Sequence, residues 1–112
     1  MQTEVYSSGF LSSANVPSLV DIPFKRQLLA GVRVILTYGR PNMQTGVCMD
    51  FVIKLTRGTE ESNIVASLTP GRTKQLHLGT FDFSPGDRIT VSASSIDPDE
   101  GEVAATVLID VG

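Results

Sequence analysis

The side chains that most often do chemistry are scarce in this chain of 112 residues, which has one histidine, His77, and one cysteine, Cys48. His77 stands between Leu76 and Leu78, an alternation that predicts a strand with the imidazole facing solvent. Cys48 has no second cysteine with which to form a disulfide or a Cys-x-x-Cys metal site, so we expect a small buried hydrophobe. No nucleophile-elbow motif and no close pairing of zinc ligands is present. The sequence therefore predicts a protein that is not an enzyme and uses no cofactor.

The acidic stretch DPDEGE, residues 97–102, is the main cluster of candidate metal ligands. Calcium prefers several oxygen ligands gathered on a flexible loop, and Asp97, Asp99, Glu100 and Glu102 would supply them. The spacing does not match an EF-hand loop, and the flanking residues read as strands rather than helices. Two interpretations stay open: a loop that binds calcium, and a solvated connection between strands that forms without an ion.

Aromatic and basic residues give little support to nucleic-acid binding. Such a site would need a basic face interleaved with aromatics, and Lys25-Arg26 beside Phe24 is a thin version of it in a chain of net charge −3. We expect these charges to form a solvated edge. The N-terminus has no apolar signal core, and no apolar run approaches the length of a membrane span. We therefore expect no nucleic-acid partner and no membrane association.

Recognition of a glycan would require exposed aromatic side chains. Phe51, Phe81 and Phe83 fall at positions that the alternation assigns to a core. The remaining candidates for a platform are Tyr6, Phe10 and Tyr38.

Charge is unevenly distributed along the chain. Residues 1–58 contain six basic and three acidic residues, whereas residues 59–112 contain three basic and nine acidic residues. If the fold places the two halves on different faces, they would form complementary patches suited to contact between copies. If the fold interleaves the halves, no patch survives.

Alternation of apolar and polar residues predicts strands through the second half. Residues 46–58 have apolar odd positions from Val47 to Leu55, which is typical of a strand with one buried face. Residues 102–112 are fairly apolar on both faces, as in a central strand. Turn sequences recur every eight to twelve residues, for example SPGD at 84–87, and this spacing is typical of a sandwich or a barrel.

One strand of this series contains a change of parity. Leu76 and Leu78 share one face, whereas Phe81 and Phe83 have the opposite parity. A regular strand cannot bury both pairs. Since glycine best accommodates an extra residue, we predict a β-bulge or bend near Gly79 and Thr80.

The first half contains a long β-branched strand at 28–38, preceded by a segment rich in serine and proline. In that segment, Val16, Val20, Ile22 and Phe24 share one parity. Two interpretations stay open. The segment is an arm that inserts these four side chains at a sheet edge of a neighbouring subunit, or it is the first strand of the chain's own sandwich.

Together these patterns predict an all-β fold, a single antiparallel β-sandwich or jelly roll of about seven to eight strands with an extended N-terminal segment. Residues 1–27 would form the arm or edge strand, and residues 28–112 the sandwich. The N-terminal segment, the hairpin at 81–94 and the alternating last strand resemble the small β-sandwich and jelly-roll proteins of tailed-phage virions. The resemblance covers most of the chain and carries over no individual residues.

The resemblance implies a structural role in a bacteriophage virion, as a capsid decoration or cement protein or an accessory protein of head or tail. The partners would be other structural subunits, including copies of the same chain, assembled in the host cytoplasm. The alternative is a cytoplasmic β-sandwich module that binds a glycan or calcium through its end loops.

Overall fold

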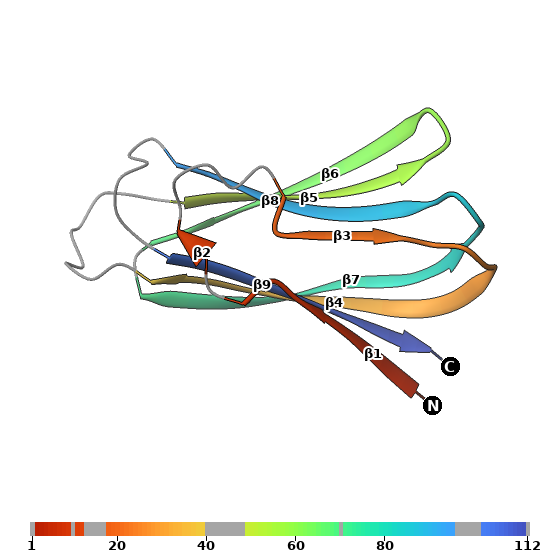
Figure 1. The fold of residues 1–112 in the computed structure, drawn as a ribbon, viewed down its shortest axis with the longest axis horizontal. Coiled ribbons are helices and arrows are strands. Elements are labelled where there is room, and N and C mark those ends of the chain that lie inside the picture. The colour runs from red at the N-terminus through yellow and green to blue at the C-terminus, as the bar shows by residue number, and fades with distance from the viewer. Residues whose placement is uncertain are drawn as a thin grey trace.

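The computed structural model describes residues 2–9, 11–12, 18–39, 49–69, 71–95 and 102–111. These residues form β-strands and the short connections between them (Figure 1). The described part of the chain has no apolar helix long enough to cross a bilayer. The strands are β1 (Gln2–Ser7), β2 (Leu11–Ser12), β3 (Val20–Pro23), β4 (Leu28–Gly39), β5 (Met49–Arg57), β6 (Glu60–Leu68), β7 (Arg72–Phe83), β8 (Arg88–Ser95) and β9 (Glu102–Val111).

The strands form two antiparallel sheets that pack face to face. One sheet, called sheet A here, has the order β1-β9-β4-β7, with the two-residue β2 also paired to β9. The other, sheet B, has the order β3-β8-β5-β6. The fold is therefore all-β, with four principal strands in each sheet, as the sequence predicted.

The order of pairing is that of a long hairpin wound into a roll. Leaving out the short β2, the first strand pairs with the last, β3 with β8, β4 with β7, and β5 with β6. Two further pairings, β4 with β9 and β5 with β8, close the sheets. This winding is the arrangement of a jelly roll, which places two Greek keys in two sheets.

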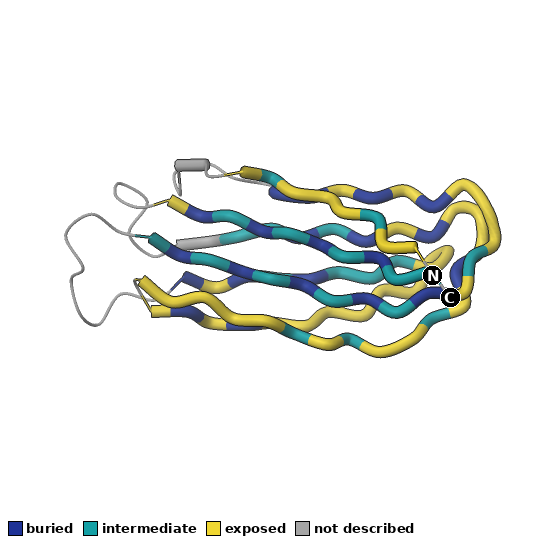
Figure 2. Tube along the Cα trace, turned by 90° about the horizontal axis from the view of Figure 1, so that it is seen from below, coloured by how far each residue is buried: buried dark blue, intermediate teal, exposed yellow. Residues whose placement is uncertain are grey.

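The core consists of the alternate side chains that face the space between the sheets. Along β4 and β9 every second residue is buried, whereas the edge strands β1, β6 and β7 are exposed over most of their length (Figure 2). The Phe24 and Phe83 rings stack with centroids 4.0 Å apart. The largest fully buried side chains are Tyr38, Phe51, Phe83, Leu36, Met49, Ile53, Ile89 and Ile109, with several valines.

The predicted bulge lies in β7. Val32 pairs with Gly79 and Arg33 with His77, so Leu78 is the extra residue on the bulged strand. Gly79 has a φ of 113°, a conformation that side-chain-bearing residues rarely adopt. The shift allows Leu76, Leu78, Phe81 and Phe83 all to pack against the core, as their opposite parities required.

The N-terminal segment is part of the sandwich. Strand β1 pairs with β9 along its whole length, and β3 pairs with β8. In this structure, the described strands on both sides of residue 27 share the same two sheets, so the segment pairs with the chain's own strands. The division into residues 1–27 and 28–112 stays a prediction.

The two halves of the chain are interleaved, so the uneven charge does not produce separate faces. In each sheet, strands from residues 1–58 alternate with strands from residues 59–112. Four ion pairs join residues of the first half to residues of the second half, with N–O distances of 2.7–3.7 Å. These pairs are Arg33–Asp110, Arg57–Asp87, Lys54–Glu61 and Arg88–Asp21.

Candidate interaction surfaces

The predicted arm residues fill the chain's own core. Val20, Ile22 and Phe24 are 7%, 2% and 7% exposed. Ile22 pairs with Ile89 across β3 and β8, which turns all three side chains toward sheet A. Burying an apolar side chain of this size stabilises the fold by about 1.5–3 kcal/mol, so withdrawing them would be costly. In this structure the three side chains pack in the chain's own core and Val16 lies outside the described residues; their insertion into a neighbouring subunit stays a prediction.

The predicted calcium ligands are placed in part. Glu102 is exposed at the first residue of β9, whereas Asp97, Asp99 and Glu100 lie outside the described residues. Within the described ranges, no three metal-ligating side chains gather in one place. The calcium interpretation stays a prediction, and a thermal-shift comparison of calcium with a chelator tests it, because a ligand of the folded state raises the melting temperature.

The candidate aromatic platform is not assembled. Tyr38 is fully buried, because the even-numbered residues of β4 face the core. Tyr6 is 37% exposed on β1, and Phe10 lies outside the described residues. His77 is exposed, as its alternation with leucines predicted, and Cys48 also lies outside the described residues.

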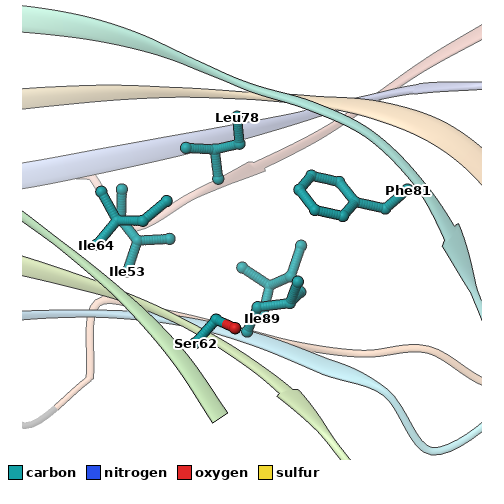
Figure 3. Close-up of a pocket in the computed structure, with 7 residues that line it drawn as sticks. Ile53, Ser62, Ile64, Leu78, Phe81 and Ile89 are labelled. Atoms are coloured by element: carbon teal, nitrogen blue, oxygen red, sulfur yellow. The ribbon is translucent and has the colours of Figure 1, made fainter.

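The sandwich has an open side between the edge strands β6 and β7, where the sheets enclose an apolar pocket of about 110 Å³. In Figure 3, Leu78 and Phe81 project from β7 toward Ile53, Ile64 and Ile89 of the opposite sheet. Leu55 and Ser62 complete the lining. Pockets for whole small molecules measure roughly 300–1,000 Å³, so this one has the size for a single apolar side chain.

A second hollow of about 300 Å³ adjoins the apolar pocket and shares Leu55, Ser62 and Phe81 with it. Its other lining residues are Arg57, Glu60, Thr80 and Asp82, which are exposed. The open side therefore has an apolar centre with a polar rim at the end of the β5–β6 hairpin. This composition is typical of protein–protein contact sites.

The opposite open side, between β1 and β3, has a mixed lining that includes charged residues. A hollow of about 260 Å³ is lined there by the charged Glu4, Lys25 and Arg26, by Tyr6, and by the apolar Ile22, Pro23, Phe24 and Leu28. The Tyr6 hydroxyl donates to Glu4 Oε2 at 3.4 Å, and Arg26 Nη2 lies 3.8 Å from Glu4 Oε1. Partial burial, followed by the nearby Glu4 carboxylate, raises the pKa of Tyr6. The two open sides thus differ in chemistry.

The outer face of sheet A carries one strongly coupled ion pair. Arg33 donates from Nε and Nη2 to the two carboxylate oxygens of Asp110, at 2.7 and 2.8 Å, and Thr3 Oγ1 donates to Oδ1 at 2.8 Å. The hydrogen bonds from Arg33, and next the one from Thr3, lower the pKa of Asp110; the same pairing raises the pKa of Arg33. The half-buried residues beside this pair on β4 and β9 are uncharged: Ile35, Thr37, Ala104, Thr106 and Leu108.

The alternation of the sequence did not reveal the pocket on the β6–β7 side. Its residues come from four strands, and the alternation shows which face a residue occupies but not where two sheets diverge. The one hint in the sequence is the adjacent apolar pair Ile64 and Val65, whose side chains point to opposite faces of the strand. In the structure Ile64 faces the core and is still 42% exposed, and Val65 is 62% exposed. An apolar pair at this position marks a sheet edge rather than a sheet centre.

Comparison with known proteins gives a fold and no sequence family. No protein-family model and no curated protein matches the sequence. The chain is similar to the VP2 subviral particle of infectious bursal disease virus, with a TM-score of 0.55 and 13% identity, over 98% of this chain and 33% of that one. The structure of the Gx strain of the same virus gives 0.54 and 12%, over 99% and 32%.

A TNF protein, Eiger from S. frugiperda, matches with a TM-score of 0.44 and 12% identity, over 84% of this chain and 66% of that one. The chain spans about a third of the length of the viral chains to which it is similar. The likeness to the two viral structures establishes the architecture: a jelly roll of the kind found in a viral particle protein.

Proposed function

We propose that this chain is a non-enzymatic structural protein of a virion, which binds neighbouring subunits through its outer surfaces. The observation that carries the proposal is the structural likeness to VP2 of a subviral particle, which extends over 98% of this chain. A structural likeness at 13% identity indicates a shared architecture only. The proposed virion role therefore rests on that architecture together with the surfaces described above.

The surfaces support this role. The interior is filled by interlocking side chains from both sheets, so the contacts available to partners are on the outside. The open side between β6 and β7 has an apolar centre and a polar rim. On the outer face of sheet A, Arg33 and Asp110 neutralise each other and leave a surface of low charge beside them. Low charge and flat β-structure favour contact between proteins.

Within this role, the resemblance noted in the sequence favours an accessory protein of a tailed-phage virion. Such a protein would decorate or cement a capsid, or complete a head or tail, and would be assembled in the host cytoplasm. Its partners would be other structural subunits, including copies of itself.

The test is the native mass of the purified full chain. Sedimentation velocity from low micromolar to near-millimolar concentration, with negative-stain electron microscopy of the most concentrated sample, should show self-association into defined oligomers or particles. A monomer at every concentration, with no structural protein co-purifying from infected or expressing cells, would contradict the proposal.

A further inference from the structure

Among the described residues the sandwich has four edge strands, and three of them carry features that prevent pairing with another chain. Strand β3 has four residues and ends at Pro23. Strand β7 is interrupted by the bulge at Leu78 and Gly79. On β1, Glu4 pairs with the buried Ile109, so its carboxylate is directed to the core side of the sheet. Short length, proline, bulges and inward-pointing charges are the known means by which edge strands avoid association.

The fourth edge strand, β6, has fewer of these features: its one charge of core-side parity, Glu60, stands at its first residue, beside the turn. It runs for nine residues in unbroken register with β5 and contains no proline. Its charges, Glu60 and Glu61, stand at its first two positions, and residues 62–68 are uncharged. Among the described residues, β5 is its one strand partner, so its other side presents unpaired N–H and C=O groups. Figure 1 shows β6 as the outermost strand of its sheet.

From this contrast we propose that β6 pairs antiparallel with β6 of a second copy of the chain, which doubles the four-stranded sheet B across a two-fold axis. The inference deepens the proposed function and rests on it, since it names one of the contacts between subunits. It adds to the proposed function a specific contact surface, strand β6, and a specific partner, a second copy of the chain.

The geometry of an antiparallel pair limits the register. A two-fold axis perpendicular to the sheet keeps the core side of both copies on the same side, and directly opposed residues share a face. Registers that centre the pair near the middle of the uncharged residues 62–68 place Ile64 opposite Ile64 of the second copy, or Val65 opposite Val65. In both registers Glu61 faces an uncharged residue, Ser67 or Thr69, and the glutamates of the two copies lie at opposite ends of the pair. The pairing therefore places no like charges opposite each other.

The apolar pocket lies at the same edge and gives the second copy a place to bury side chains. Ser62 and Ile64 of β6 line the pocket mouth together with Leu78 and Phe81 of β7. In the paired sheet, the even-numbered side chains of the second β6 lie on this side as well. Ile64 of the second copy would cover the mouth, and apolar surface that water reaches in the monomer becomes buried, which favours association.

A charge on the exposed face of β6 tests the proposal. Val65→Lys places two lysines close to each other across the two-fold axis in either register. The matched controls are Val5→Lys on β1 and Leu29→Lys on β4, because these side chains are 61% and 63% exposed, against 62% for Val65. We expect Val65→Lys to weaken dimerisation in sedimentation equilibrium by about tenfold or more, since like charges that face each other are strongly unfavourable. The controls should leave it unchanged, with far-ultraviolet circular dichroism confirming that all three variants fold.

Disulfide formation gives a second readout. In a Cys48→Ser background, Ile64→Cys or Val65→Cys should form a symmetric disulfide dimer under mild oxidation, depending on which register is adopted, while Val5→Cys should not. If the wild-type chain self-associates but Val65→Lys associates equally well and neither cysteine cross-links, the β6 inference is overturned and the proposed function stands. A wild-type monomer at all concentrations overturns the β6 inference, and it overturns the proposed function as well only if no structural protein co-purifies with the chain. Open-ended aggregation without a discrete dimer also overturns the β6 inference.

Discussion

Arg57 on β5 holds the buried carboxylate of Asp87 in the turn between β7 and β8. Nε and Nη2 of Arg57 lie 3.2 and 3.1 Å from Asp87 Oδ2, and the backbone N–H of Ser84 donates to the same oxygen at 2.9 Å. Nη2 also donates to the carbonyl of Asp82 at 2.6 Å. Because β5 belongs to sheet B and β7 to sheet A, this cluster connects the two sheets at one end of the sandwich.

Replacement of Asp87 should destabilise the fold strongly. The side chain is 6% exposed, and Asp87→Ala removes the acceptor for Arg57 and for the Ser84 N–H. Hydrogen bonds to charged groups contribute roughly 1.5–3 kcal/mol, so we expect a loss of about 2–3 kcal/mol in the free energy of unfolding measured with urea. Asp21→Ala breaks the more exposed pair with Arg88 and should cost about 0–1 kcal/mol. Equal losses in the two variants would contradict the assignment.

The bulge in β7 should depend on glycine at position 79. Its φ of 113° is strained for any residue with a Cβ, although no atom lies within 4 Å of that Cβ position. We expect Gly79→Ala to lower the free energy of unfolding by about 1–2 kcal/mol. Gly31→Ala is the control, because its backbone is ordinary and its added Cβ would meet atoms at 3.9 Å; it should be neutral or stabilise by roughly 0.4–1 kcal/mol. If Gly79→Ala left the free energy of unfolding unchanged, residue 79 would not need a positive φ in the folded chain, which would contradict the bulge described here.

The Arg33–Asp110 pair should make stability depend on pH in acid. The hydrogen bonds from Arg33 and then Thr3 lower the pKa of Asp110 in the folded chain. A lowered folded-state pKa means that the stabilisation is complete above the unfolded value of about 3.9 and is lost as the pH falls through the folded value. Urea unfolding between about pH 6 and pH 2 should therefore show a shallower loss of stability for Asp110→Asn than for the wild type. Thr3→Val, which removes the weaker contributor, should change the profile in the same direction by less. An acid profile of Asp110→Asn identical to that of the wild type would rule out this linkage.

Phe24→Ala tests whether the N-terminal segment belongs to its own core. The ring stacks on Phe83 at 4.0 Å and is 7% exposed, so its removal should cost about 3–5 kcal/mol in the monomer. Val5→Ala, at a side chain 61% exposed, should stay within about 0.5 kcal/mol. If Phe24→Ala left the monomer as stable as before and weakened only its assemblies, the arm interpretation would be restored.

Alternation in the sequence determined most of the fold, because period two specifies the face on which each side chain lies. The opposed parities of Leu78 and Phe81 even located the bulge, since two buried pairs of opposite parity demand one extra residue. The pairing partners were not accessible in this way. Val20, Ile22 and Phe24 share a face in both an arm and an internal strand, and only the winding of the chain decides which sheet receives them.

The interaction surfaces were less predictable for a related reason. The charge difference between the halves is plain in the sequence, but its effect depends on which strands become neighbours. The order of the strands places the basic residues of β4 and β5, in the first half of the chain, beside acidic residues of the second half. Lys54, which lies beside Glu61, is one example. Likewise the pocket between β6 and β7 joins residues as distant as Ile53 and Ile89, so no local pattern marks it.

The wound pairing of the strands also governs how the chain can fold. Every strand pair joins a strand before residue 58 to a strand after it, and the loops that close the pairs lengthen from the β5–β6 turn outward to β1 and β9. Short loops close at the smallest entropic cost, so structure should begin at that turn and grow toward both ends, with the terminal strands joining last. A nascent chain emerging from the ribosome would remain without its outermost pairing until β9 has been released, and refolding should be slow, in the millisecond-to-second range of sandwich proteins.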